Sequence, residues 1–347
     1  MLFKAVVLTC FETFLDGRSV SAVYHLLTGK KSIQTVQDAH IYQLNHFYGI
    51  YPALRKETFD NQLRKMVQEG FLILRPDNTA LPAKKSKEQI DSVTDSVMQS
   101  FRGQAYHRQT LVFWERLLLI IQTMTNSRMN YFHFIPIIDK RDVTDWVKKQ
   151  YKQWKAQESI FLQKLYGELF HMLQFLSKRD AGIFVDSLTG YGHYGLSRFQ
   201  LADRYQLEQI DVPLVRTGIL HYLMTLIEQN PRAYPLLGQL FFDLPQTTTL
   251  TNSASKTKAL LDKQYTTQQI ASVRHLKLNT IYDHMVEIAL YDDTFPLDDY
   301  VSPEEHAEIR TAIEGSASFK LKAIKEQVRE TISYFQIRLV MAADSLS

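Results

Sequence analysis

The sequence contains a single cysteine, Cys10, among its 347 residues. One thiol excludes a disulfide framework within the chain and a zinc site built from cysteines. A chain poor in cysteine suits the reducing cytoplasm, where we expect this protein. The longest apolar run near the start, residues 5–8, and the run at 117–121 are too short to span a membrane. We therefore expect neither a signal peptide nor a membrane partner.

Motifs for nucleotide-driven motors and for catalysis are also missing. No GxxxxGK[ST] run occurs, and the Gly-rich run GYGHYG at 190–195 lacks the Lys-Ser/Thr pair that completes a P-loop. We interpret this run as a loop. The histidines have no carboxylates at metal-ligand spacing, and no nucleophile–base pair stands out. The sequence thus predicts a protein that is not an enzyme, with no cofactor, no metal and no small-molecule substrate.

The composition is that of an ordinary folded protein. Hydrophobic residues make up 45% of the chain and charged residues 22%, which suffices for two or three domains with buried cores. The net charge is +3, but residues 257–347 carry more acidic than basic side chains. That imbalance counts against simple phosphate neutralisation by the C-terminal part of the chain.

Residues 1–85 predict a winged-helix-like domain. Apolar periodicity and caps place helices at residues 2–15, 19–29, 38–48 and 55–69. A turn at Pro76-Asp77-Asn78 then joins two short strands at 71–75 and 79–81. The exposed side of the fourth helix supplies candidate DNA contacts, namely Lys56, Asn61, Arg64 and Lys65. The alternative is a small helical domain whose charges only meet solvent.

The middle of the chain, residues 105–244, predicts an all-helical domain. Its longest pattern, residues 143–176, breaks near 157–159, and its first half carries four lysines beside Tyr151 and Trp154. Such aromatics either stack on single-stranded bases or pack inward, and the second arrangement is commoner. Residues 86–103 predict a linker or a solvent-facing helix. The polar stretch 245–256, PQTTTLTNSASK, predicts a flexible tether.

Residues 265–291 follow the pattern of a helix-turn-helix. Thr266 or Thr267 can cap the first helix, with Gln268 or Gln269 near the third helical position. Ala271 is small where the helices cross, and Ile281 and Met285 face inward on the second helix. His275 occupies the turn position that favours glycine, although histidine tolerates the left-handed region better than most residues. Residues 319–341 predict a last helix.

The second helix of such a motif is the one that lies in a DNA major groove. We expect Asn279, Thr280 and Tyr282 to face the groove, while Arg274 and Lys277 hold phosphates. Asp283 either accepts from a cytosine amine or repels the backbone. The alternative is a helical hairpin whose apolar side chains pack in the core and which has no role in DNA binding.

Two segments, QQIASVRHLKLNTIYDHMVEIA and PLDDYVSPEEHAEIRTAI, resemble the helicase-type helix-turn-helix domain that ends some RecQ-family helicases. The same domain ends the stand-alone YpbB-like proteins of Firmicutes. SAVYHLLTGKKSIQTVQDAHIY and LTGYGHYGLSRFQLA extend the resemblance to that family over most of the chain. It implies a helix-turn-helix domain at 257–347 in a mainly α protein.

The resemblance also implies a function. It points to a DNA-bound, non-catalytic partner of a RecQ-type helicase that works in DNA repair or recombination. Two other functions remain open on the residues alone. One is a sequence-specific transcription regulator, and the other is an adaptor that docks on a helicase without touching DNA. The acidic C-terminal segment favours the adaptor.

Overall fold

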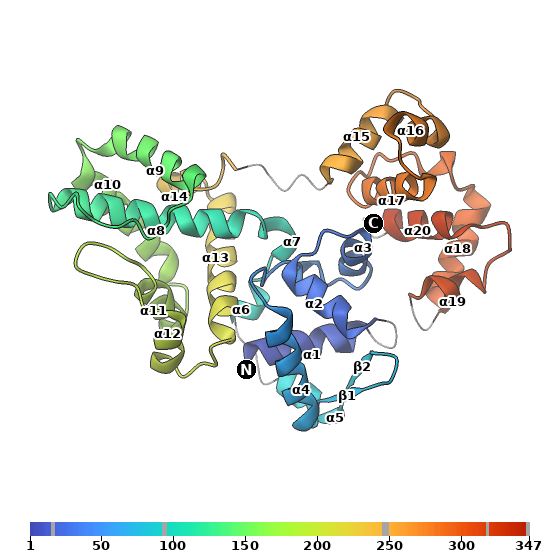
Figure 1. Cartoon of the computed structure of the whole chain (residues 1–347), viewed down its shortest axis with the longest axis horizontal. Coiled ribbons are helices and arrows are strands. Elements are labelled where there is room, and N and C mark those ends of the chain that lie inside the picture. The colour runs from blue at the N-terminus through green and yellow to red at the C-terminus, as the bar shows by residue number, and fades with distance from the viewer. Residues whose placement is uncertain (15–17, 92–95, 245–249, 317–318, 345–347) are drawn as a thin grey trace. The chain divides into compact units, whose positions relative to one another are not determined.

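The structure is a computed structural model that describes residues 1–14, 18–91, 96–244, 250–316 and 319–344. It confirms the predicted fold class, because the described residues form helices and one two-stranded sheet (Figure 1). No helix among these residues is long and apolar enough to cross a bilayer. The chain forms two compact units. The first joins Met1–Val6, Ile50–Pro52 and Gln89–Thr247, and the second joins Val7–Gly49, Ala53–Glu88 and Thr248–Ser347.

The first unit is all-helical, as predicted for the middle of the chain. Its elements are α6 (Ser96–Gln99), α7 (Gly103–Tyr106), α8 (Gln109–Arg128), α9 (Arg141–Trp154), α10 (Glu158–Leu173), α11 (Lys178–Asp186), α12 (Arg198–Arg204), α13 (Asp211–Gln229) and α14 (Pro235–Gln239). Helix α8 is buried along most of its length, since α9, α10 and α13 all pack on it. The break between α9 and α10 falls where the sequence placed it.

The aromatic residues of α9 turn inward. The Tyr151 hydroxyl lies 2.8 Å from Ser127 Oγ, and the Trp154 ring packs on Phe161 with centroids 5.5 Å apart. Their lysine neighbours on the outer face, such as Lys152, are exposed. This arrangement favours the packing alternative over base stacking for the aromatic residues of α9.

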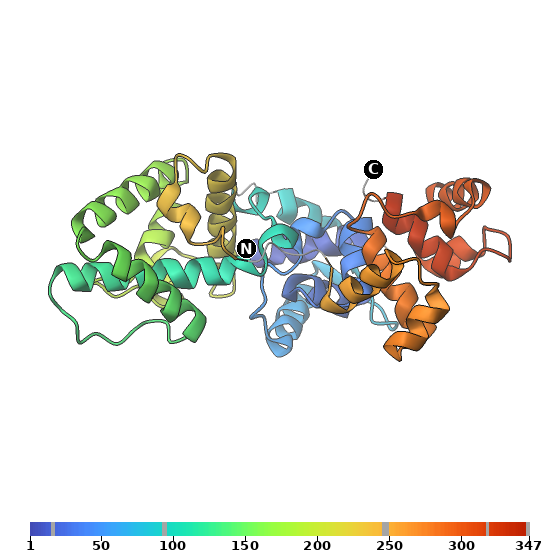
Figure 2. The ribbon, with the colours of Figure 1, turned by 90° about the horizontal axis from the view of Figure 1, so that it is seen from above.

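The second unit contains the sheet and the remaining helices, while α1 (Leu2–Phe14) and α5 (Lys84–Asp91) run from one unit into the other. Its N-terminal elements are α2 (Val20–Thr28), α3 (Ile33–Ile41), η2 (Asn45–Phe47), α4 (Lys56–Gln68), β1 (Leu72–Leu74) and β2 (Ala80–Pro82). Its C-terminal elements are α15 (Asn252–Leu261), α16 (Thr267–Arg274), α17 (Leu278–Ala289), η3 (Leu297–Asp299), α18 (Pro303–Gly315), α19 (Leu321–Lys325) and α20 (Tyr334–Ala343). Figure 2 shows the orange and red C-terminal helices gathered together.

The order of helix and hairpin predicted for the N-terminal segment is confirmed. Strands β1 and β2 pair antiparallel with Ile73 opposite Leu81, and Asn78 takes a positive φ of 60° in the turn. The hairpin is tied to α2 because the Val20 amide donates to the Asn78 carbonyl at 2.9 Å. The third helix begins earlier in the chain than predicted, directly after Ser32, whose side chain accepts a hydrogen bond from the Thr35 amide.

Two C-terminal expectations are wrong. The stretch expected to be a tether begins a helix at Asn252, because the Thr251 hydroxyl accepts from the Ala254 amide at 3.0 Å. Residues 245–249 of that stretch lie outside the described residues. The last helix is interrupted between α19 and α20, where the Lys325 ammonium donates to the Glu330 carbonyl at 2.9 Å. A capping box at Ser333 and Gln336 then restarts it.

One contact within the second unit joins segments far apart in sequence. Helix α3 packs against α17 and α20, and Ile33 and Val36 lie on the hydrophobic core of the C-terminal helices. The His40 ring meets the Tyr291 ring edge-on at 5.5 Å. The N-terminal and C-terminal segments of this unit therefore share a core, and the division into domains at 1–85, 105–244 and 257–347 remains a prediction.

Candidate nucleic-acid interface

The helix-turn-helix is built from α16, a tight turn and α17. Thr266 caps α16 through a capping box. The Thr266 hydroxyl accepts from the Gln269 amide, and the Gln269 side-chain oxygen accepts from the Thr266 amide. His275 ends the helix in the left-handed conformation, with φ 52° and ψ 42°. Lys277 precedes α17 without a side-chain cap bond. These features match the local reading of the sequence and fix the angle at which α17 leaves the turn.

The inward faces of the two helices form the predicted core. Ile270 of α16 and Ile281 and Met285 of α17 have no exposed surface. They join a hydrophobic cluster that includes Ile309 of α18 and Val340 of α20. Every residue from 284 to 289 in α17 is buried, including polar His284 and Glu287. Only the N-terminal part of α17 therefore faces solvent.

Three of the predicted DNA contacts lie on that open end. Lys277 and Asn279 are exposed, and Thr280 is half-buried beside them. The N-terminal residues of a recognition helix are the ones that reach base edges in known helix-turn-helix complexes. The structure thus places a cation, an amide and a hydroxyl together where such a helix would enter a groove.

Arg274 is turned into the domain instead of toward solvent. Its guanidinium donates to the Ser253 carbonyl at 2.8 Å and to Ser253 Oγ at 2.9 Å, and it also reaches the Thr257 hydroxyl. Thr257 is bonded in turn to Nδ1 of His284 at 2.9 Å. Burial and the nearby Arg274 charge lower the pKa of His284, which keeps that ring neutral. In this geometry Arg274 joins α15 to the motif.

Replacing Arg274 with alanine is expected to destabilise the protein rather than only weaken ligand binding. The change leaves acceptor oxygens on half-buried Ser253 and buried Thr257 without their donor, which costs about 1–3 kcal/mol. Urea unfolding of the full chain measures it, with Lys277→Ala as the exposed control, for which we expect a change within about 0.5 kcal/mol. An Arg274→Ala protein that unfolds like the wild type but loses DNA affinity would make Arg274 a phosphate contact.

Tyr282 and Asp283 are also engaged within the unit. The Tyr282 ring stacks on Phe335 of α20 with centroids 4.1 Å apart. The Asp283 carboxylate accepts from Arg338 Nη1 at 2.7 Å, and Arg338 also reaches Gln37 of α3. Both side chains are half-buried, so they act as supports for α17 in this arrangement. Arg338 also balances the negative charge of Asp283 beside the open end of the helix.

A second polar surface lies on α4 and the hairpin. Lys56, Asn61, Arg64 and Lys65 are all exposed, as the sequence predicted. Lys56 pairs with Asp60, and Arg64 donates to the Asn61 side chain. An open hollow of about 560 Å³ lies between this face, the start of α2 and the hairpin.

Sequence reasoning missed the residues that position the motif. Ser253 and Thr257 lie in or next to the stretch interpreted as a tether, and Arg338 lies 55 residues beyond Asp283. A local feature that indicates the start of α15 is Thr251, a residue type that favours the N-cap position and here accepts a hydrogen bond from the Ala254 amide. Within the described part of the chain, no group of three His, Cys, Asp or Glu side chains is placed to hold a metal.

Comparison with known proteins agrees with this architecture. Residues 253–341 match the model of a family described as a helix-turn-helix domain. Protein YpbB of Bacillus subtilis (strain 168) is 29% identical over 342 residues, which cover 98% of this chain and 96% of that protein. No solved structure matches. The family match begins within α15, one residue after its first helical position, so α15 belongs to the motif's domain.

Proposed function

We propose that this YpbB-like protein, which ends in a helix-turn-helix domain, is a non-catalytic DNA-binding protein. The observation that carries the proposal is the exposure of Lys277 and Asn279 at the N-terminal end of α17, whose residues 284–289 are all buried. In this proposal the open end of α17 enters the major groove. Lys277 neutralises a phosphate, while Asn279 and Thr280 meet base edges.

Arg274, Tyr282 and Asp283 have supporting roles in the proposal. Arg274 anchors the end of α16 to α15, and Tyr282 and Asp283 hold α17 against α20. Because α17 is already held in place, it loses less conformational entropy when it binds. A fixed helix also keeps Asn279 in a constant position relative to Lys277, as base reading requires.

The face of α4 is proposed as a second contact with the DNA backbone. Arg64 and Lys65 are exposed on the helix that directly precedes the hairpin, as in winged-helix proteins. Lys56 and Asn61 complete this face, where Lys56 pairs with Asp60 and Asn61 accepts a hydrogen bond from Arg64. An exposed ion pair such as that of Lys56 with Asp60 is weak and exchanges easily for phosphate.

The test is fluorescence anisotropy of the full chain on duplex DNA over a range of salt concentrations. Lys277→Ala is expected to weaken binding to every duplex and to reduce the slope of log K against log salt by about 1. The matched control is Lys322→Ala, an exposed lysine of α19 in the same unit, which should bind like the wild type. Equal salt slopes for the wild type and Lys277→Ala would contradict the proposed contact.

Asn279→Ala separates two forms of the proposal. If recognition is sequence-specific, the variant loses about 1–3 kcal/mol on the preferred site and little elsewhere. A uniform small effect on all duplexes would mean that α17 binds DNA without reading it. A selected consensus sequence would favour the transcription regulator over a helicase accessory protein.

The family resemblance and one structural observation keep an adaptor as the second candidate. Most of α17 is buried and residues 257–347 are acidic overall, which suits a protein partner more than phosphate. We propose a RecQ-type helicase as the partner, with a role in DNA repair or recombination. Anisotropy on forked DNA with and without such a helicase distinguishes the candidates. An adaptor would bind the fork only when the helicase is present.

A further inference from the structure

A pocket in the first unit lies apart from the proposed DNA-binding surfaces. It has a volume of about 260 Å³ and lies between α8, α13 and the loop that enters α12. The apolar part of its lining consists of Trp114 and Leu118 of α8, with Ile137, Leu196 and Leu201. The polar part consists of Ser187, Thr189, Ser197, Arg198 and Arg216.

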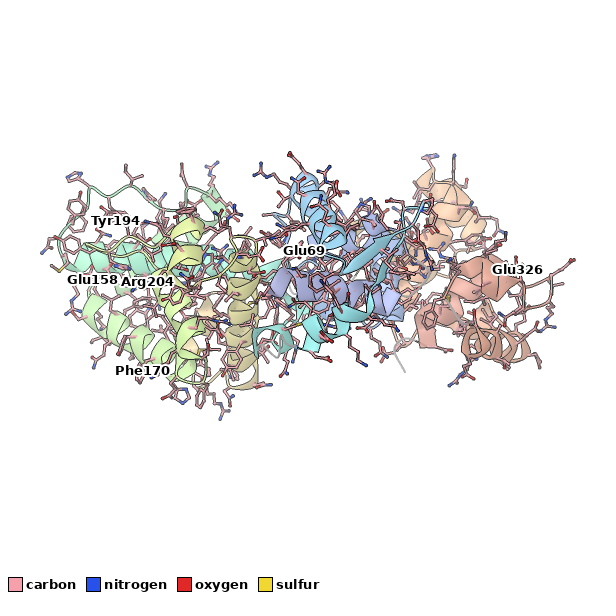
Figure 3. The ribbon with its side chains drawn as sticks, turned by 90° about the horizontal axis from the view of Figure 1, so that it is seen from below. Glu69, Glu158, Phe170, Tyr194, Arg204 and Glu326 are labelled. Carbon is pink, nitrogen blue, oxygen red and sulfur yellow. The ribbon has the colours of Figure 1, made fainter. Side chains whose placement is uncertain are left out.

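The Gly-rich run shapes this pocket. The Gly195 amide donates to Thr189 Oγ1 at 3.0 Å, which folds the loop back on itself. A Cβ on Gly195 would lie 2.5 Å from the Ser187 carbonyl oxygen, so this position tolerates no side chain. Gly190 and His193 close the turn through paired backbone hydrogen bonds of 2.9 and 3.2 Å. Tyr194, beyond the turn, points to solvent with 82% of its surface exposed (Figure 3).

The charge of the pocket has one sign. Its lining includes two arginines and no aspartate or glutamate. The Arg216 guanidinium lies over the Trp114 ring, 5.6 Å from its centroid, and Arg198 donates to the Tyr51 hydroxyl. Among the described residues neither arginine has an ion pair, whereas Arg116, Arg179 and Arg204 of the same unit each pair with an aspartate.

An arginine in this situation is costly without an anion. Burial lowers the pKa of Arg216, yet a guanidinium stays protonated in proteins. A charge that is partly removed from water and lacks a counter-charge destabilises the fold. The flat fork of an arginine matches the oxygens of phosphate in bidentate hydrogen bonds. Two such forks beside an indole and aliphatic side chains suit an anionic group attached to an apolar body.

We propose that this pocket binds a phosphomonoester, with its phosphoryl group on Arg198 and Arg216 and its organic part against Trp114. Ser197 adds a hydroxyl that can donate to the same group. The pocket is near the lower end of the volumes found for small-molecule sites, so it admits the phosphoryl group and the portion next to it. A free nucleotide and the phosphorylated end of an oligonucleotide share this chemistry. The proposal does not depend on DNA binding by α17.

The test uses the full chain and the fluorescence of its tryptophans, with isothermal titration as a second measurement. The probes are inorganic phosphate, adenosine 5′-monophosphate, adenosine, and one oligonucleotide with and without a 5′-phosphate. We expect saturable binding of adenosine 5′-monophosphate and at least tenfold weaker binding of adenosine. A preference for the phosphorylated oligonucleotide over the nucleotide would identify a nucleic-acid end as the source.

Variants decide whether the pocket is responsible. Arg198→Gln and Arg216→Gln are each expected to weaken binding of adenosine 5′-monophosphate at least tenfold. Arg128→Gln, at an exposed position on the same unit, should bind like the wild type. Arg198 is exposed, so its variant remains informative if Arg216→Gln fails to fold. Binding that both variants leave unchanged, or no binding of any phosphorylated probe by the wild type, would overturn the proposal.

Discussion

Replacing Ile281 with alanine is expected to lower the free energy of unfolding of the second unit by about 2–5 kcal/mol. Ile281 has no exposed surface and lies in the cluster that joins α16, α17, α18 and α20. Removing its branched chain loses the transfer free energy of three carbons and leaves a cavity that rigid neighbours do not fill. We expect a large effect because the neighbouring helices pack around Ile281 and cannot easily move into the cavity.

Urea unfolding monitored by circular dichroism measures this loss, with Asn279→Ala as the control two residues earlier on the open side of α17. The control should unfold within about 0.5 kcal/mol of the wild type. If Ile281→Ala were as stable as its control, α17 would not be packed as described. The proposed interface would then lack its rigid support.

Acid is expected to destabilise the first unit through His221. This histidine is fully buried. Its Nδ1 atom accepts a hydrogen bond from the Arg102 amide at 3.0 Å, and its Nε2 atom lies 3.0 Å from Thr110 Oγ1. Thr110 donates its own proton to the Tyr106 carbonyl at 2.7 Å, so Nε2 carries the proton and the ring is neutral. Burial, with Arg102 adding a smaller effect, lowers the pKa of His221 to about 3.

The sign of the pH dependence follows from that pKa. In the unfolded chain His221 protonates near pH 6.5, whereas in the folded protein it stays neutral down to about pH 3. Its contribution is therefore complete above pH 6.5 and declines by about 1.4 kcal/mol for each pH unit below that value. Between pH 6.5 and 4.5 the loss amounts to roughly 2–3 kcal/mol.

A comparison of the wild type with His221→Gln isolates this group. Glutamine can accept and donate at similar positions but does not titrate, so the other groups contribute equally to both proteins. The free energy of unfolding, measured at several pH values from 7 to 4.5, should fall less steeply for the variant. Parallel curves for the two proteins would mean that His221 is not held neutral in the folded state.

Local rules predicted much of the motif. The capping pair Thr266 and Gln269, the left-handed turn at His275 and the inward stripe through Ile281 all depend on neighbours within a few residues. The same holds for the hairpin after α4. Sequence spacing is sufficient for such features because their hydrogen bonds and packing partners lie one or two turns away.

The features that the sequence could not predict depend on distant partners. The spacing predicts a phosphate contact for Arg274 and does not predict its hydrogen bonds to half-buried Ser253 and buried Thr257 on α15. The spacing predicts that Asp283 either accepts from a cytosine amine or repels the DNA backbone, and it does not predict the ion pair of Asp283 with Arg338 on α20. The arginines of the phosphomonoester pocket come from segments 18 residues apart, and no spacing rule joins them.

The most direct test asks whether DNA covers the open end of α17. The native thiol, Cys10, is fully buried and its pKa is raised by burial, so it does not compete for alkylating reagents. Asn279→Cys adds one accessible thiol at the proposed contact, and Lys322→Cys adds one on α19 as the control. The rate of alkylation is measured with and without saturating duplex DNA. We predict slower alkylation for Asn279→Cys only, whereas unchanged rates at both positions while the duplex is bound would contradict the account.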